Sequence, residues 1–359
     1  MRRTTKIAAA SMAAMLALAG CASSNNETNE PSGGNETDAG GGSGEGGSGD
    51  GPKIGLAYDV GGRGDQSFND SAFAGIEEAA NQFDATYKEI EANAGENDAD
   101  REERLRVLAD AGYDPIIAVG YVYSPAVDTV GAEYPELSFA VVDGFSEAEN
   151  AANLDFAANE GSFLVGVAAA LTTKSNNVGF IGGVDGPLIQ AFEAGYVAGV
   201  EAVDPKIEIQ IQYLSQDDAV KGYENPAGGK IAATGMYENG ADVVYHAAGK
   251  SGLGLFDAVV AAGEGNWAIG VDSDQYLTAD PDQQPYILTS MLKRIDVSIV
   301  EYVKAFVDRK APTGYVVYDL ETGGVDYATS GGFVDDIKDE IDDYKQKILD
   351  GEIEVPAEP

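Results

Sequence analysis

From Lys53 onward, short apolar runs of strand length alternate with longer amphipathic segments. The predicted strands cover residues 54–60, 86–91, 115–119, 138–143, 178–182, 207–214, 242–246, 268–271 and 287–291. The segments between them have helical periodicity, as in residues 67–83, where apolar side chains recur every three or four positions. This alternation predicts parallel sheets covered by helices on both faces. About 300 residues are too many for one such core, so we predict two α/β lobes.

A strand, a Gly/Asp turn and a helix occur in that order twice. The first copy contains "IGLAYDVGG" and the second "VGFIGGVDGP". Ligands of open α/β sheets collect beyond the carboxyl ends of the strands. Two facing lobes would therefore place both turns in one cleft.

The N-terminus is typical of an exported protein. A basic "MRRTTK" precedes the apolar "IAAASMAAMLALAG", which is shorter than the roughly 20 residues of a membrane span. The segment ends in "LAGC", which resembles the lipobox of lipoproteins. We expect residues 1–20 to be a signal peptide and Cys21 to be lipidated, although a buried thiol is the alternative. Arg2 and Arg3 leave both the general and the twin-arginine export routes open.

Residues 21–52 are rich in Gly, Ser, Asn and Glu and contain almost no apolar side chains. Such a segment buries too little surface to offset the entropy of ordering, so we predict a disordered tether to the lipid anchor. Asn26 and Asn35 lie in N-x-T sequons, which indicate glycosylation or arise by chance in an Asn-rich tract.

The formal net charge is −39, from 61 acidic and 22 basic residues. Nucleic acid is an improbable partner, because binding it requires a basic surface. A charge of this size repels itself at ordinary ionic strength, whereas near-molar salt screens it within about 3 Å. We infer a halophilic archaeon as the source.

Catalytic and cofactor motifs are absent from the sequence. The turn "GGRGDQS" is one residue short of a dinucleotide fingerprint, and the chain has no P-loop, G-x-S-x-G, H-E-x-x-H or cysteine nucleophile. The acids around "DSD" at 272–274 lack EF-hand spacing. We therefore expect no enzyme activity, no cofactor and no metal. The only histidine, His246, either touches a ligand or is structural.

Polar residues at strand ends are the candidates for ligand contact. Asp59, Asp143 and Asp272 each end a strand, and each either caps the following helix or accepts hydrogen bonds from a diol. Ser67 and Asp70 fit a capping box at the start of the predicted helix.

Six blocks carry a family resemblance: "DVGGRGDQSFNDSAFAGI", "VVDG", "NEGSFLVGVAAALTT", "VGFIGGVDGPLIQAFEAGYVAGV", "HAAGKSGLGLFDA" and "AIGVDSDQ". In this order they resemble the basic membrane protein family of nucleoside-binding lipoproteins, from Lys53 to about Asp343. The resemblance implies a periplasmic-binding-protein fold of class I, with two Rossmann-like lobes joined by a three-crossover hinge. It also implies delivery of purine nucleosides to an ABC transporter.

The resemblance also implies roles for individual residues. Phe68 would stack on the base, with Asn69 and Asp59 at its polar edge. Asp272 and Asp143, helped by Lys293, would hold the ribose hydroxyls. The ligand-binding residues expected in this way are Asp59, Phe68, Asn69, Asp143, Phe192, Gly249, Asp272 and Lys293.

Phe192 is the expected second ring, with Tyr245 behind it, although a core position is the alternative. The sequence departs from the family's usual "AGGTGxG" with "AAGKSGLG". Lys250 thus replaces a small residue. This change leaves the exact ligand open and would admit a ligand with an acidic group.

We expect lobe 1 to comprise residues 53–158 and 272–311, and lobe 2 residues 159–271 and 312–345. Residues 346–359 would form an acidic tail. The hinge crossings are expected near 157–160, near 271–275, and either at 291–293 or just after the helix that follows Lys293. Closure of the lobes would bury the ligand.

The predicted function is a monomeric solute receptor, anchored to the outer face of the membrane, that serves ABC permease and ATPase subunits. A sugar or signalling-molecule receptor of the same fold is the main alternative, and an exported nucleoside hydrolase is a further one.

Overall fold

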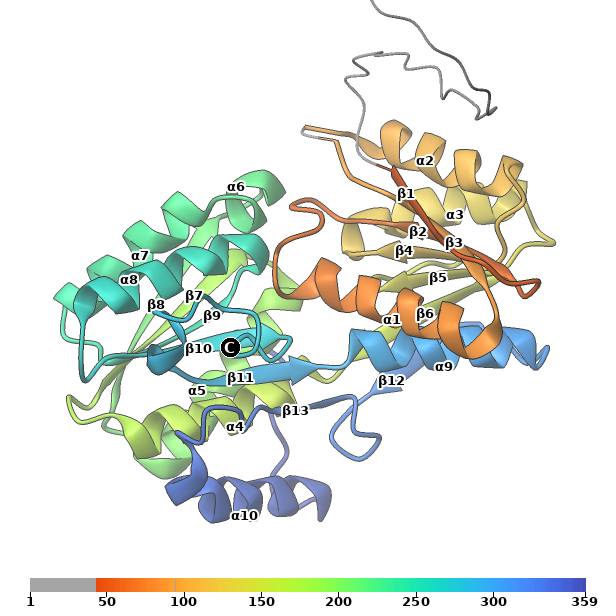
Figure 1. Cartoon of the computed structure of the whole chain (residues 1–359). Helices are drawn as coiled ribbons and strands as arrows, with labels where there is room; N and C mark the ends of the chain where they lie inside the picture. Colours follow the sequence, from red (N-terminus) through yellow and green to blue (C-terminus); the bar gives the residue numbers. More distant parts are fainter. Residues whose placement is uncertain (1–42, 94) are drawn as a thin grey trace, which may run out of the picture. The chain divides into compact units, whose positions relative to one another are not determined.

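The computed structural model describes residues 43–93 and 95–359 (Figure 1). Several predictions lie outside these residues: the signal peptide, lipidation of Cys21, both sequons and most of the tether. Within the part of the chain that is described, no helix is both long and apolar enough to cross a membrane.

Two separate sheets confirm the predicted pair of α/β lobes. The seven-stranded sheet has the order β1-β3-β2-β4-β5-β6-β12 and is parallel except for the β1–β3 pair. The six-stranded sheet has the order β13-β11-β10-β9-β7-β8 and is parallel except for the β11–β13 pair. In chain order, the strands are β1 Ser43–Gly47, β2 Lys53–Ala57, β3 Thr86–Ile90, β4 Ile116–Val119, β5 Phe139–Val142, β6 Ala151–Phe156, β7 Asn177–Val184, β8 Glu208–Ser215, β9 Val243–Ala247, β10 Trp267–Asp272, β11 Ile287–Lys293, β12 Gly314–Tyr318 and β13 Val325–Tyr327.

Helices cover both faces of each sheet (Figure 1). Lobe 1 contains α1 Phe68–Phe83, α2 Asp98–Asp110, α3 Ser124–Glu133 and α9 Ile295–Val307. Lobe 2 contains α4 Ala158–Thr172, α5 Pro187–Val203, α6 Ala219–Tyr223, α7 Pro226–Glu238, α8 Leu253–Ala262 and α10 Lys338–Leu349. Short 3₁₀ turns are η1 Tyr121–Tyr123, η2 Gly249–Gly252, η3 Gln284–Tyr286 and η4 Asp335–Ile337.

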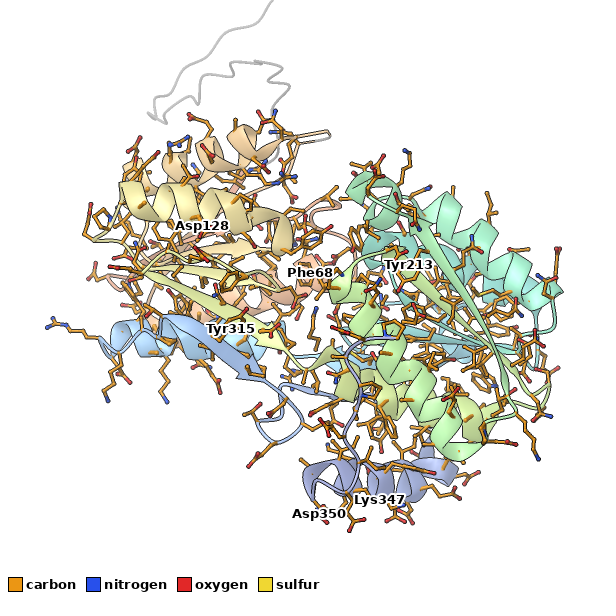
Figure 2. The ribbon with its side chains drawn as sticks, turned by 180° about the vertical axis from the view of Figure 1, so that it is seen from behind. Phe68, Asp128, Tyr213, Tyr315, Lys347 and Asp350 are labelled. Carbon is orange, nitrogen blue, oxygen red and sulfur yellow. The ribbon has the colours of Figure 1, made fainter. Side chains whose placement is uncertain are left out.

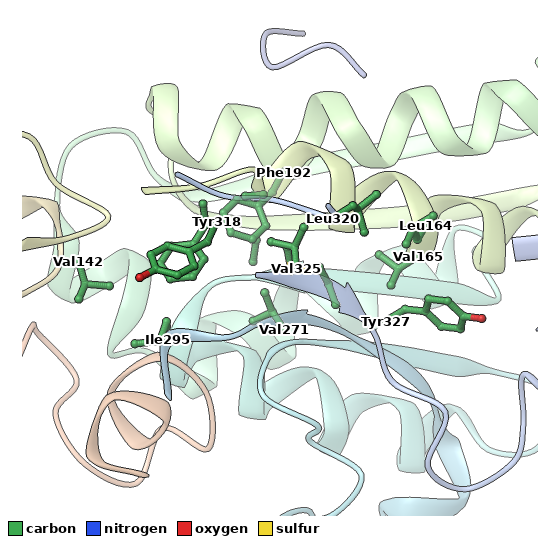
Figure 3. Packing of buried hydrophobic residues seen from close by; sticks show 14 of the residues in the cluster. Val142, Leu164, Val165, Phe192, Val271, Ile295, Tyr318, Leu320, Val325 and Tyr327 are labelled. Atoms are coloured by element: carbon green, nitrogen blue, oxygen red, sulfur yellow. The ribbon is translucent and has the colours of Figure 1, made fainter. Parts of the chain in front are cut away.

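Alternate residues of a central strand face opposite helix layers, as the period of two requires. In β4, Ile116 and Ala118 pack with α2 and α3, whereas Ile117 and Val119 belong to the cluster that contains α1 and α9. That second cluster continues from one lobe into the other. Figure 3 shows Tyr318, Ile295 and Val325 within it, so the hinge itself has an apolar core.

The chain crosses between the lobes three times within the described residues, which agrees with the class implied by the resemblance. The crossings lie at Ala157 between β6 and α4, at Arg294 between β11 and α9, and at 319–324 between β12 and β13. Lobe 1 therefore comprises residues 43–157 and 294–318, and lobe 2 comprises 158–293 and 319–359.

The structure crosses between the lobes within the predicted 157–160 and next to the predicted 291–293, but the predicted crossing at 271–275 is wrong. After β10 the chain stays in lobe 2, because β11 pairs with β10 in the same sheet. Residues 272–293 therefore belong to lobe 2 and not to lobe 1. Residues 314–318 were predicted in lobe 2, but they form β12 and pair with β6 of lobe 1.

Both ends of the described chain are more ordered than predicted. β1 lies inside the expected tether and pairs with β3, so residues 43–47 are not a free linker. The expected tail at 346–359 is also held in place. Ile353 and Val355 pack against the main core, and Asn159 Nδ2 donates a hydrogen bond to the Val355 carbonyl at 2.8 Å.

Candidate functional site

A cavity lined by residues of both lobes lies between them. All eight expected ligand-binding residues line it: Asp59, Phe68, Asn69, Asp143, Phe192, Gly249, Asp272 and Lys293. Several of them follow the carboxyl ends of strands in both sheets, which is where open α/β sheets place ligands. Figure 2 shows Phe68 where the lobes meet.

Asp65 organises the first turn of α1 and thereby places Phe68 and Asn69. Its carboxylate accepts hydrogen bonds from the backbone N–H of Ser67 at 3.0 Å, of Asn69 at 2.8 Å and of Asp70 at 3.1 Å. These are the donors that a helix start leaves without partners. Burial raises the pKa of Asp65 to about 6, and the three N–H groups counteract that rise.

The predicted capping box of Ser67 and Asp70 is therefore wrong. The Ser67 hydroxyl leaves its own helix and donates to Asp272 Oδ2 of the other lobe at 2.5 Å. The Asp70 carboxylate reaches back to the glycine-rich turn, where it accepts from Gly64 N at 3.0 Å and Gln66 N at 2.9 Å. Asp70 thus stabilises the turn, Ser67 contacts the other lobe, and Asp65 caps the helix.

Asp59 and Asn69 form a linked polar pair in the wall of the cavity. Asn69 Oδ1 accepts from the Asp59 N–H at 3.2 Å, and Asn69 Nδ2 donates to Asp65 Oδ2 at 3.1 Å. One N–H of the Asn69 amide remains for a ligand. Burial raises the pKa of Asp59 to about 7, opposed by the Val60 N–H, so this carboxyl is able to donate or accept near neutral pH.

Gly120 permits that position of Asp59. Its φ is +98°, and a Cβ added there would lie 2.0 Å from Asp59 Oδ2. A residue with a side chain would therefore displace the carboxylate as well as strain the backbone.

In the same cavity, Lys293 forms a buried ionic cluster with Asp143 and Asp272. Its ammonium contacts Asp143 Oδ2 and lies 3.5 Å from Asp272 Oδ1, and the exposed fractions of the three side chains are 3%, 3% and 6%. Burial alone would lower the pKa of Lys293, but the two carboxylates raise it, so the ammonium stays charged. Among the described residues, Asp143 Oδ1 and Asp272 Oδ1 have no hydrogen-bond donor, which leaves two buried acceptors for ligand hydroxyls.

Two aromatic rings flank this cluster. The Lys293 ammonium lies 4.8 Å from the centre of the Phe68 ring and 5.2 Å from that of Phe192. Phe192 lines the cavity and also belongs to the main apolar core, so a position facing the ligand and a core position do not exclude each other. Tyr245 does not line the cavity; it is fully buried against Phe180 and Tyr196.

His246 is structural. It is fully buried, its Nε2 lies 3.0 Å from Gln275 Oε1, and burial lowers its pKa to about 4.

The structure adds residues that sequence reasoning missed. Tyr121 and Tyr223 line the cavity from opposite lobes, together with Asp65 and Leu188. Tyr121 lies two residues after the end of β4. The criterion that selected Asp59, Asp143 and Asp272, a polar residue near the end of a strand, therefore also applies to Tyr121. Tyr223 ends the short helix α6 and carries no comparable signal. Of the chain from residue 43 on, excluding residue 94, no group of three or more His, Cys, Asp or Glu is placed to hold a metal ion.

Two lobes with mainly parallel sheets, three crossings and a cavity at the facing strand ends define the class: a periplasmic-binding-protein-like fold of class I. Residues 53–359 match the family model described as "ABC transporter substrate-binding protein PnrA-like". The chain belongs to this family, which confirms the predicted resemblance, and it is an ABC transporter substrate-binding protein.

Known proteins agree with this assignment. The chain is 35% identical to a "CD4+ T-cell-stimulating antigen" of Listeria monocytogenes, over 85% of this chain and 88% of that protein. It is 32% identical to the "ABC transporter nucleoside-binding protein BmpA" of Lactococcus lactis subsp. cremoris, over 99% of each. The crystal structure of an ABC transporter solute-binding protein from Aeropyrum pernix K1 covers 85% of this chain and 94% of its own, with a TM-score of 0.73 and 27% identity.

Proposed function

We propose that this chain binds a purine nucleoside between its lobes and delivers it to the permease and ATPase subunits of an importer. It does so outside the cytoplasm, anchored to the membrane through Cys21. The observation that carries the ligand assignment is that one cavity is lined both by a polar pair, Asp59 and Asn69, and by an ionic cluster with two free acceptors. We assign the pair to the base end of the ligand and the cluster to its sugar end, in that order.

This order suits a nucleoside placed lengthwise. The base would stack on Phe68, with Phe192 on its other side, because any base offers a flat π face. Its polar edge would meet Asp59 and the free N–H of Asn69. The ribose diol would donate to the unpartnered oxygens of Asp143 and Asp272, and a ligand without those hydroxyls would leave both acceptors unpaired.

The sugar end favours a neutral ligand over a phosphorylated one. Beyond Asp143 the cavity adjoins a second interlobe space, which we call the acidic chamber. Asp155, Asp185 and Asp217 line it with Asp143, and none of the described residues that line it is Lys or Arg. A phosphate on the ribose would meet uncompensated negative charge there.

The test is a thermal-shift panel of the full chain in molar KCl with nucleosides, free bases, ribose, other sugars and nucleotides. A ligand at 100 times its dissociation constant adds about 2.7 kcal/mol of stability. We expect purine nucleosides to stabilise the protein, and we expect Phe68→Ala and Asp272→Asn to abolish that shift. Phe83→Ala, at the far end of the same helix, is the matched control and retains it. Stabilisation by sugars alone would refute the nucleoside assignment.

The anchor needs a separate measurement. Wild-type protein should partition into the detergent phase of a membrane extract, and Cys21→Ser protein should not. Equal partitioning of the two would refute lipidation at Cys21.

A further inference from the structure

A third interlobe space adjoins the ligand cavity and shares Val60 and Lys250 with it. We call it the polar chamber; Arg63, Glu91 and Glu224 also line it. Val60 directly follows Asp59, which marks the base end of the proposed ligand. The polar chamber therefore continues the cleft beyond the edge of the base.

Lys250 stands between the two spaces. From lobe 2 its ammonium donates to the Gly61 carbonyl of lobe 1 at 3.2 Å. The lobes are close at this point, because a Cβ added to Gly61 would lie 3.7 Å from Lys250 Cβ. An ammonium has three donors, so two remain once Gly61 is bound.

The charge of Lys250 has no partner at contact distance. Over residues 43–93 and 95–359, no carboxylate oxygen forms an ion pair with its ammonium, although the chain has 61 acidic residues. Arg63, the other cation of the chamber, is held by Asp70 at 3.0 Å and by Glu89 at 3.2 Å. Lys250 is thus the cation in this chamber that is available to a ligand.

The two chambers differ in charge. The polar chamber has two basic and two acidic residues on its wall, whereas the acidic chamber has four aspartates and no base among its described residues. Burial raises the pKa of Glu91, and the Arg63 N–H and the charges of Arg63 and Lys250 oppose that rise. An anionic substituent is therefore accommodated at the base end and opposed at the sugar end.

We infer that the cleft accepts purine nucleosides whose base carries a carboxylate-bearing substituent, and that Lys250 is the residue that selects them. This inference rests on the proposed nucleoside function and on the orientation given above. The substituent would leave the edge of the base, pass Val60 and place its carboxylate against the Lys250 ammonium. The charge-assisted hydrogen bond replaces or joins the bond from Lys250 to Gly61.

The experiment is calorimetric titration of the full chain with three probes. These are adenosine, adenosine with a dicarboxyethyl group on its exocyclic amine, and the dimethyl ester of the second probe. The ester has nearly the same shape without the charge. We expect the wild-type protein to bind the acid at least about tenfold more tightly than the ester, the value of one charge-assisted hydrogen bond.

Variants identify the residue responsible. The acid-to-ester ratio should fall to about one in Lys250→Met and return in Lys250→Arg. Lys221→Met is the matched control, because Lys221 is exposed in the same lobe and lines neither space; its ratio should equal that of the wild type. Any general effect of Lys250 on closure of the lobes changes both affinities alike and cancels in the ratio.

Three outcomes overturn the inference. Equal binding of acid and ester, or a ratio that Lys250→Met leaves unchanged, shows that Lys250 does not select the carboxylate. Binding of adenosine without either substituted probe shows that the chamber does not admit a substituent. These results leave the proposed function intact, whereas failure of every nucleoside to bind removes both.

Discussion

Replacement of Lys293 by Met tests whether the ionic cluster holds the closed cleft together. Met retains most of the apolar stem, which passes the rings of Phe68 and Phe192. The change therefore removes the charge and keeps much of the packing. What remains is a pair of buried carboxylates, Asp143 and Asp272, without a counter-ion.

The size of the effect follows from burial. Removal of one partner from a buried ion pair costs about 3–5 kcal/mol, because the other charge is left uncompensated. The side chains here are at most 6% exposed, so this range applies. Burial raises the pKa of Asp143, so in acidic buffer the orphaned Asp143 carboxyl binds a proton and loses its charge. The destabilisation should therefore be smaller in mildly acidic buffer than in neutral buffer.

The assay is urea unfolding in molar KCl at both pH values, since salt screens surface charges far better than buried ones. Lys304→Met, which removes an exposed lysine of α9, is the control and should cost no more than about 0.5 kcal/mol. Asp143→Asn added to Lys293→Met should restore part of the loss. A cost for Lys293→Met below about 1 kcal/mol, or one that does not fall with pH, would refute the argument.

Further predictions concern the base end, the lobe contact and the sugar end. The pKa of Asp59 rises from 3.8 to about 7 on folding, so the loss of stability caused by its buried charge is absent below pH 4, grows up to pH 7 and is complete above pH 7. Urea unfolding should therefore show that Asp59→Asn becomes more stable relative to the wild type as the pH rises from 4 to 7. A difference that stays constant over this range would contradict the prediction. Gly61→Ala at φ +93° and Gly64→Ala at φ +81° should each cost about 1–3 kcal/mol in urea unfolding through backbone strain. Because the added Cβ of Gly61 would make only ordinary contacts across the lobes, 3.5 Å from the Tyr223 carbonyl oxygen and 3.7 Å from Lys250 Cβ, the two losses should be similar, and a much larger loss for Gly61→Ala would contradict this. Adenosine 5′-monophosphate should bind at least about tenfold more weakly than adenosine in calorimetry, owing to the acidic chamber, and equal affinity would reverse the proposed orientation.

Local pattern was enough to predict nine of the strands, since most of them are apolar or alternating runs whose period and length are properties of consecutive residues. β12, which reads "GYVVY", carries the same signal and was missed, whereas β6 and β13 lack it. β6 reads "AANLDF", with no β-branched residue, and β13 has three residues. Both are strands because a neighbouring strand satisfies their backbone hydrogen bonds, and no local pattern reports such a neighbour.

The candidate site was predictable for the same kind of reason. Residues that follow parallel strands must gather at one edge of a sheet, so Asp59, Asp143 and Asp272 came together as expected. The capping box failed because a second acid, Asp65, was better placed to take the N–H groups of α1. The choice between Asp65 and Ser67 depended on a partner for Ser67 that lies 205 positions away.

The net charge, the alternation of strands and helices and the family were therefore predictable from the order of residues alone. The tertiary structure decided which sheet received β11 and β12, where the chain crosses between the lobes, and that Lys250 reaches Gly61 across the cleft. The physical reason is distance along the chain. Periodicity and turn chemistry act over a few residues, whereas strand pairing and lobe contact depend on segments hundreds of residues apart that compete for the same hydrogen bonds and the same buried space.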